Sequence, residues 1–227
     1  MKKEMENTGG KLALPERREI SFERWEEENV QQYELLMEFY EAAMEKTVRV
    51  LKDLSEQILA EKGSNPIRRI SSRLKSSASI AEKLARKGLT YVADNIEEHV
   101  HDVAGVRVIC PTPNDVYLVA ARVLDRPEFT LVRKKDYILN PKKTGYRSLH
   151  LILTMDVTVN GESRRIPVEI QVRTIAMDWW ASLDHDMRYK TPDLAIDSLS
   201  RELEECARLA EKLDAKMLEE EIGRSSI

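Results

Sequence analysis

The dipeptide Asn160-Gly161 limits the fold of this chain more than any other local feature. Both residues tolerate the positive φ angles of a type I′ turn, and they separate two segments in which apolar and polar residues alternate. We therefore predict a β-hairpin whose strands cover residues 149–158 and 164–173.

The second strand of this hairpin has two chemically different faces, because successive side chains of a strand point to opposite sides. One face is apolar and is expected to join the core: Val168, Ile170 and Val172. The other face presents a carboxylate, an amide and a guanidinium in a row: Glu169, Gln171 and Arg173. The polar row is either a solvent face or part of a site.

Further strands and helices are expected around the hairpin. Apolar spacing and turn signals predict helices over residues 21–61, 113–125, 175–189 and 194–221, and strands over 103–110 and 129–134. The segment 67–77 is basic and either extended or irregular, and residues 1–20 are expected to form a loose arm. We expect the last helix to pack on the first.

A short helix is expected to open at the capping-box pattern Ser79-Ile-Ala-Glu82 and to close at Gly88. Ser79, Lys83 and Arg86 share one of its faces. A basic ridge that begins at a helix N-terminus can hold phosphate. A solvated helix face is an equally good interpretation of this segment alone.

Composition indicates a protein with a real core. The chain has 227 residues, of which 42% are hydrophobic, and no stretch has the length of a membrane span. Its two cysteines lie far apart, and the N-terminus lacks the apolar stretch of a secretory signal. We expect a cytoplasmic protein without a membrane partner.

Positive charge gathers in two middle segments although the net charge is −4. Residues 64–90 hold seven lysines and arginines against one acid, and residues 131–150 hold six against one. This pattern favours a small polyanion in a basic cleft over a long nucleic acid, which needs a broad basic face.

The second basic segment, residues 134–150, is expected to be a loop that runs into a strand. It combines four lysines with two tyrosines and one histidine, and it continues into the apolar run 149–153. Phosphates need fixed positive charge and a base needs a flat partner, so the segment predicts a nucleotide site. A solvated basic surface is the alternative, but the apolar run anchors this charge to the edge of a core.

Asp102 and Glu169 are two carboxylates within this basic background. Mg²⁺ binds through one or two carboxylates together with substrate phosphates, so the pair indicates phosphoryl transfer. The chain has neither a P-loop nor a dinucleotide-binding glycine pattern. His99 and His101 beside Asp102 suggest a metal hydrolase, but with four histidines in the chain a histidine-rich metal site is disfavoured.

Four motifs in order resemble the synthetase domain of RelA/SpoT homologues in its stand-alone form, the small alarmone synthetases. They lie within residues 73–88, 101–110, 135–150 and 168–185, and include Arg73-Leu-Lys-Ser, His101-Asp-Val-Ala-Gly-Val-Arg, Lys142-Lys-Thr-Gly-Tyr-Arg-Ser-Leu-His150 and Val168-Glu-Ile-Gln-Val-Arg-Thr. The resemblance implies an α+β fold: a mixed β-sheet flanked by helices, related to nucleotidyltransferases, with long N- and C-terminal helices.

The resemblance also implies the reaction. Such enzymes use Mg²⁺ to transfer pyrophosphate from ATP to the 3′-hydroxyl of GDP or GTP, giving the stringent-response alarmones ppGpp or pppGpp and AMP. Asp102 would hold the metal, and Glu169 would orient the 3′-hydroxyl, act as base and share the metal. No hydrolase activity is expected, since His101-Asp102 belongs to the synthetase motif.

The remaining roles follow by motif. Arg73 and Arg107 would sandwich the adenine, and four residues would hold the ATP phosphates: Lys75, Ser79, Lys83 and Arg86. Five residues would hold GDP or GTP: Tyr146 on the guanine, Lys142 and His150 on the phosphates, and Gln171 and Asp178 along the guanosine pocket.

The resemblance divides the chain into an N-terminal arm and helix (1–63), the synthetase core (64–190) and a C-terminal amphipathic helix (191–227). The flanking segments would pack on the core or assemble a homo-oligomer, a tetramer in many relatives. The runner-up is a nucleotide- or RNA-binding regulator with a degenerate synthetase fold. The intact pair Asp102 and Glu169 argues against it, so RNA binding is not indicated.

Overall fold

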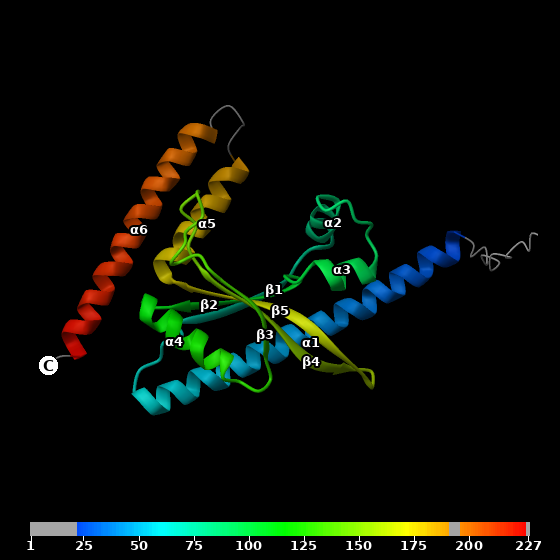
Figure 1. Ribbon diagram of the computed structural model, residues 1–227, viewed down its shortest axis with the longest axis horizontal. Helices are drawn as coiled ribbons and strands as arrows, with labels where there is room; N and C mark the ends of the chain where they lie inside the picture. The colour runs from blue at the N-terminus through cyan, green and yellow to red at the C-terminus, as the bar shows by residue number, and fades with distance from the viewer. Residues whose placement is uncertain (1–21, 191–195, 226–227) are drawn as a thin grey trace, which may run out of the picture.

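The computed structural model describes residues 22–190 and 196–225 (Figure 1). The described elements follow one another as α1 (Phe22–Lys62), β1 (Arg69–Leu74), α2 (Ser77–Ala85), α3 (Ala93–His99), β2 (Ala104–Cys110), α4 (Pro113–Leu124), β3 (Thr130–Asp136), β4 (Leu149–Val159), β5 (Glu162–Thr174), α5 (Ile175–Lys190) and α6 (Ile196–Ser225). The arm expected over residues 1–20 lies outside the described residues.

In the described part of the chain, five strands form one sheet in the order β1-β2-β5-β4-β3. Only β2 and β5 run parallel, and the other neighbours are antiparallel, so the sheet is mixed as expected. The hairpin of β4 and β5 turns at Asn160 and Gly161, whose φ angles are 50° and 82°. These positive values confirm the type I′ turn, and the hairpin fills two central positions of the sheet.

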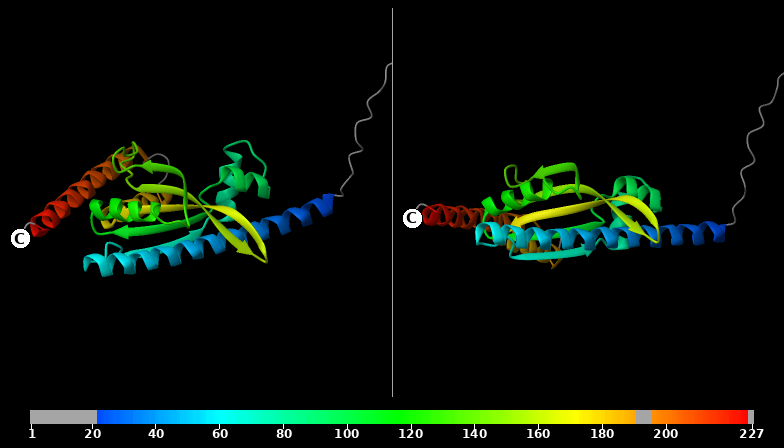
Figure 2. Two further views of the ribbon diagram at one scale, coloured as in Figure 1. Left: turned by 60° about the horizontal axis from the view of Figure 1, so that its bottom comes forward. Right: turned by 90° about the horizontal axis from the view of Figure 1, so that it is seen from below.

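The long helix α1 runs along one face of the sheet (Figure 2). Its buried side chains recur every three or four residues and meet the apolar face of β4 and β5 and the helix α4. The largest fully buried side chains of α1 are Leu36, Phe39, Tyr40, Leu51 and Ile58. Because this face is sealed by α1 and α4, any site on the sheet must lie on the other face.

Two helix starts show one case in which the local sequence pattern matches the cap and one in which it does not. At α4, Thr112 and Asp115 form a complete capping box. At α2 the predicted capping box at Ser79 is wrong, because the hydroxyl of Ser76 accepts the backbone N–H of Ser79 and caps the helix three residues earlier. Ser76 is extended, as an N-cap must be, and Gly88 follows the helix with a φ of 70° as predicted.

The C-terminal helix α6 packs on α5 and not on α1, contrary to the prediction (Figure 1). A second apolar cluster joins the two helices: Ala176, Trp180, Leu203, Ala207 and Ala210. The indole N–H of Trp180 donates to the carbonyl of Leu203 at 2.7 Å. The buried edge of α6 uses small alanines that let the helices approach closely, whereas Leu209, Leu213 and Met217 remain exposed.

No helix in the described ranges is both long and apolar enough to cross a bilayer.

Asp214 on α6 gives a prediction of pH-dependent stability. Burial is the largest influence and raises the pKa of this carboxyl from 3.8 to about 6, although the Thr174 hydroxyl donates to it. The folded state therefore binds more protons than the unfolded state between these values, and stability falls as pH rises through this window. We expect Asp214→Asn to raise the free energy of unfolding by about 1–3 kcal/mol at pH 7.5.

The measurement is urea unfolding of both proteins at pH 7.5 and at pH 4, where most of the gain should disappear. An asparagine variant that is less stable than the parent at pH 7.5 would show that the charged carboxylate is stabilising.

Candidate functional site

The open face of the sheet carries polar side chains in cross-strand rows, because paired residues of neighbouring strands share a face. One row crosses the five strands as Ser71, Arg107, Gln171, His150 and Lys135. The next row is Arg73, Gly105, Glu169, Ile152 and Arg133. Seven of the residues predicted from the sequence for the site therefore stand on this face or beside it, at adjacent positions: Arg73, Arg107, Glu169, Gln171, His150, Asp102 and Tyr146.

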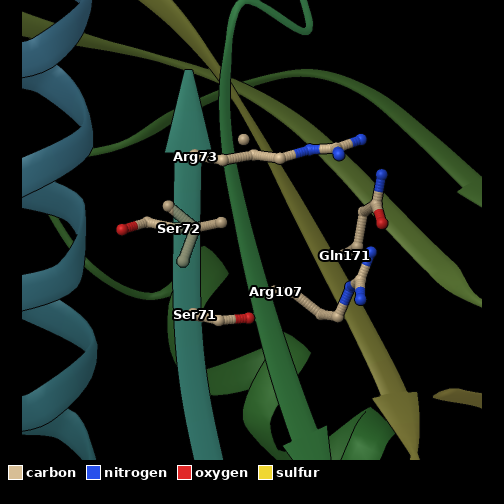
Figure 3. Close-up of a pocket in the computed structure, with 7 residues that line it drawn as sticks. Ser71, Ser72, Arg73, Arg107 and Gln171 are labelled. Carbon is tan, nitrogen blue, oxygen red and sulfur yellow. The ribbon is translucent and has the colours of Figure 1, made fainter. Parts of the chain in front are cut away.

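The first of two adjoining pockets lies over β1 and β2 and has a volume of about 220 Å³. Figure 3 shows Arg73, Arg107 and Gln171 projecting from β1, β2 and β5 toward the same side. Two flat guanidinium groups from neighbouring strands can stack on the faces of a planar ring. The fold brings Arg73 and Arg107 to one pocket, and their stacking on adenine stays a prediction.

The second pocket is larger, about 630 Å³, and lies between the α2–α3 segment, β3 and the loop before β4. Its lining holds five lysines and arginines against three carboxylates: Lys83, Lys87, Arg133, Lys135 and Lys142, against Glu98, Asp102 and Glu169. Gln171 lines both pockets. A ligand in one pocket is thus separated from a ligand in the other by a single side chain.

Asp102 lies at the entrance of β2 between two lysines. Lys83 of α2 donates to it at 2.7 Å, and Lys75 donates at 3.3 Å. Burial alone raises the pKa of this carboxyl, but the two ammonium groups outweigh burial and hold the pKa below its usual value. Asp102 is consequently ionised at neutral pH.

Glu169 is more deeply placed and only 9% exposed. The ring Nδ1 of His150 lies 3.0 Å from one oxygen, and the amide of Gln171 donates to the other at 2.7 Å. Burial is again the largest influence and raises the pKa, but His150 and Gln171 together bring the pKa below its usual value. Glu169 is therefore a buried, ionised carboxylate that can accept a proton or a hydrogen bond.

The loop between β3 and β4 brings an aromatic ring and a cation into the second pocket. The Nζ of Lys142 lies 4.8 Å from the ring centre of Tyr146 and 4.9 Å from that of Tyr137. The hydroxyl of Tyr146 lies 2.8 Å from Nε2 of His150. A tight turn, in which the Gly145 N–H donates to the Lys142 carbonyl at 2.8 Å, holds this arrangement.

The chemistry of these groups suits a hard cation shared with phosphates. Within residues 22–190 and 196–225, no three acid, histidine or cysteine side chains gather into a metal cluster. Asp102 and Glu169 nevertheless line the same pocket. Mg²⁺ needs only one or two carboxylates when phosphates complete its shell, so this pair fits Mg²⁺ better than zinc.

Four predicted site residues lie apart from the lining of both pockets. Lys75 is one of them, although it pairs with Asp102 of the second pocket. Ser79 and Arg86 are on α2, where Ser79 is half-buried and its hydroxyl accepts from that of Ser76, and Arg86 is exposed. Asp178 is 6% exposed at the start of α5 and pairs with Arg69 at 2.6 Å and with Arg107 at 3.0 Å. Asp178 thus lies behind an arginine of the first pocket.

Sequence reasoning missed several residues that surround the site. Arg133, Lys135 and Tyr137 line the second pocket from alternate positions of one edge of the sheet. Their period of two could have identified them, since Arg133 lies in the predicted strand 129–134 and Lys135 and Tyr137 follow it at alternate positions. Arg173 was placed on the polar face but given no role, because its partners Tyr146 and Ser148 lie 27 and 25 residues away in the sequence.

Gly145 yields a prediction with a matched control in Gly161. Both have positive φ, 86° and 82°, but a Cβ on Gly145 would lie 2.5 Å from the Cβ of Ala207 on α6, whereas a Cβ on Gly161 would meet nothing within 4 Å. We expect Gly161→Ala to cost about 1 kcal/mol from backbone strain alone. Gly145→Ala should cost about 1–3 kcal/mol more, because the loop must leave α6.

Urea unfolding measures both variants, and trypsin cleavage after Lys142 or Lys143 reports on the loop itself. Equal losses and unchanged cleavage would show that the loop does not depend on α6.

Comparison with known proteins adds independent findings. The family model described as a region found in RelA / SpoT proteins matches residues 72–193. The chain is 46% identical to the GTP pyrophosphokinase YwaC of Bacillus subtilis over 156 residues, which cover 69% of this chain and 74% of that protein. It is 34% identical to the GTP pyrophosphokinase YjbM of the same organism over 189 residues, covering 83% and 88%.

Solved structures agree with these matches. The crystal structure of small alarmone synthetase 1 from Bacillus subtilis, bound to its product pppGpp, superposes with a TM-score of 0.77 and 32% identity, covering 87% of this chain and 100% of that one. Small alarmone synthetase 2 from the same organism gives a TM-score of 0.73 and 39% identity, covering 84% and 98%.

Proposed function

The chain belongs to the RelA/SpoT family as a small alarmone synthetase, a GTP pyrophosphokinase, and we propose that it transfers pyrophosphate from ATP to the 3′-hydroxyl of GDP or GTP. The observation that carries this proposal is that two ionised carboxylates, Asp102 and Glu169, line the larger pocket, which adjoins the smaller one at Gln171. A transfer between two nucleotides requires one pocket for each and anionic groups at their junction.

The smaller pocket is assigned to the donor. Its paired guanidinium groups, Arg73 and Arg107, would stack on adenine and supply positive charge at the same time. The triphosphate would then extend past Gln171 toward α2. There Lys75, Lys83 and the more exposed Ser79 and Arg86 are available for its oxygens.

The larger basic pocket is assigned to the acceptor. Tyr146 offers a ring for guanine, while Lys142 and His150 line the same space for the 5′-phosphates. Gln171 lies at the boundary, where the ribose would be. Asp178 is buried behind Arg107, so its contribution to the guanosine pocket would be made through neighbouring side chains.

Asp102 and Glu169 would hold Mg²⁺ together with the donor phosphates. When bound, the ion would supply positive charge that neutralises the phosphate oxygens. The ammonium groups of Lys83 and Lys75, which now pair with Asp102, would then be released to the phosphates.

The transfer makes one bond and breaks one. The 3′-oxygen of the acceptor attacks the β-phosphorus of ATP, and the bond from that phosphorus to the α–β bridging oxygen breaks, so that AMP leaves with the oxygen. The proton of the 3′-hydroxyl passes to Glu169, whose lowered pKa keeps it ionised and whose partners His150 and Gln171 fix its position.

The proposal includes the division of the chain into an arm and helix (1–63), a synthetase core (64–190) and a C-terminal helix (191–227). Exposed apolar side chains on α5 and α6, among them Trp179, Leu209 and Leu213, support burial against further subunits, and a homotetramer is proposed. The proposal also includes synthesis of the alarmone without its hydrolysis, and a cytoplasmic location.

Glu169→Gln tests the reaction. The amide keeps the shape of the side chain but cannot take the proton, so we expect loss of product formation by at least about a hundredfold with an unchanged melting temperature. The assay follows label from γ-labelled ATP into a guanosine product by thin-layer chromatography, with GDP and GTP in parallel and with and without Mg²⁺. Full activity of the variant would remove the assignment of Glu169.

Binding of nucleotides by the parent protein without any labelled product would contradict the synthetase function and favour a regulator. A titration with RNA over a range of salt concentrations would then test that alternative.

The two pockets are distinguished by a pair of variants. We expect Arg73→Ala to raise the KM for ATP about tenfold and Tyr146→Ala to raise the KM for the guanine nucleotide about tenfold, because each removes one stacking partner. Each variant serves as the control for the other. A rise in both constants in both variants would mean that the pockets are not separate.

A further inference from the structure

Arg173 is a buried cation that the proposed reaction leaves without a task. It is 4% exposed at the end of β5, yet its guanidinium has four partners. It donates to the Tyr146 hydroxyl at 2.6 Å, to the Gln171 side-chain oxygen at 2.8 Å and to the Ser148 hydroxyl at 3.3 Å. It also pairs with Asp178 at 3.5 Å.

These contacts close a ring of hydrogen bonds around the acceptor pocket. From Arg173 the ring passes through Tyr146 to His150, from His150 to Glu169, and back through Gln171. The five members come from β5, β4 and the loop before β4.

Arg173 and Glu169 determine which group donates in each hydrogen bond of the ring. Arginine can only donate, and an ionised carboxylate can only accept. The Tyr146 oxygen therefore accepts from Arg173, and in the neutral form of the His150 ring the Tyr146 hydroxyl donates to Nε2. His150 then carries its proton on Nδ1 and donates to Glu169.

The orientation of Gln171 is determined in the same way. Its oxygen must face Arg173, which has no acceptor, and its amide nitrogen must face Glu169, which has no donor. Gln171 lines both pockets, so the orientation selected by Arg173 is presented to both ligands.

A second connection runs from Arg173 to the donor pocket. Asp178 contacts Arg173 and also Arg107, which lines that pocket, at 3.0 Å. A buried guanidinium without a carboxylate would be costly, and Asp178 supplies that carboxylate. The hydrogen bonds from Arg173 to Tyr146 and Gln171 are shorter than its ion pair with Asp178. A substitution of Arg173 should therefore affect the proposed acceptor pocket more than the donor pocket.

We propose that Arg173 is a positioning residue for the guanine nucleotide, which it affects by holding the Tyr146 ring and the Gln171–Glu169 pair in place. The inference rests on the proposed function, which assigns the guanine to Tyr146. Because Arg173 is more than nine-tenths buried, it acts through these side chains and does not itself touch the substrate.

Arginine is required at this position by geometry as well as charge. Its planar fork presents five donors in fixed directions, whereas a lysine ammonium is a compact point charge. Arg173→Lys therefore keeps the cation but cannot hold Tyr146, Gln171 and Ser148 together. Arg165→Lys is the matched control, because Arg165 lies on the same strand but is exposed and pairs only with Asp156 among the ion pairs found in the structure.

The experiment measures KM for the guanine nucleotide and for ATP, together with kcat. For Arg173→Lys we expect the KM of the guanine nucleotide to rise about tenfold and that of ATP to change less than about twofold, as for loss of one charge-assisted hydrogen bond. Arg165→Lys should match the parent in both constants. A variant in which both KM values change equally, or only the melting temperature falls, would overturn the positioning role.

Tyr146→Phe keeps the proposal testable if Arg173→Lys does not fold. It preserves the ring for stacking but removes the hydroxyl that Arg173 holds, so the guanine KM should still rise by several-fold. Where Arg173→Lys does fold, its effect and that of Tyr146→Phe should not add in the double variant, since both break the contact between Arg173 and Tyr146. An unchanged guanine KM in Tyr146→Phe, or full additivity, would overturn the proposal.

The outcome for the proposed function is read separately from the parent protein. A parent that forms no labelled guanosine product refutes the synthetase function. An active parent whose guanine KM is insensitive to Arg173→Lys refutes only the positioning role.

Discussion

The structure depends on one constraint, which is that β5 buries charge. A central strand of the sheet presents Glu169 and Arg173 on one face, and both are less than a tenth exposed. Burying unpaired charges is costly, so every segment that meets this face must bring partners. The loop before β4 supplies Tyr146, β4 supplies His150, and α5 supplies Asp178. The larger pocket, which we assign to the acceptor, is lined by several of these partners, among them Tyr146 and His150.

The same constraint explains why the C-terminal helix α6 supports the site, although it lines neither of the two pockets on the open face of the sheet. The loop that carries Tyr146 is rich in charged side chains and buries few apolar side chains of its own. Gly145 lies against Ala207 of α6 and beside Trp180 of α5, in the second apolar cluster. The helix pair therefore serves as the back wall of the loop, and its opposite side, with Leu209 and Leu213, stays open.

Local chemistry made much of this predictable. The turn at Asn160-Gly161 fixed the hairpin, and its alternation placed Glu169, Gln171 and Arg173 on one face. The partner of α6 was predicted wrongly, because amphipathic spacing shows that a helix packs but not on what. The same limit applies to Arg173, because its partner Tyr146 is brought to it only when β4 pairs with β5.

The hairpin turn also determines which residues of β5 point to the open face of the sheet and which point to the core. Every functional side chain of β5 is two positions from the next, and the residues between them form the core. A substitution in this strand alters one group, but an insertion or deletion of a single residue would exchange the two faces completely. Hydrophobic side chains would then face the nucleotides, and carboxylate and guanidinium would enter the core. A change of length between the turn and Thr174 therefore keeps the two faces only when residues are added or removed in pairs.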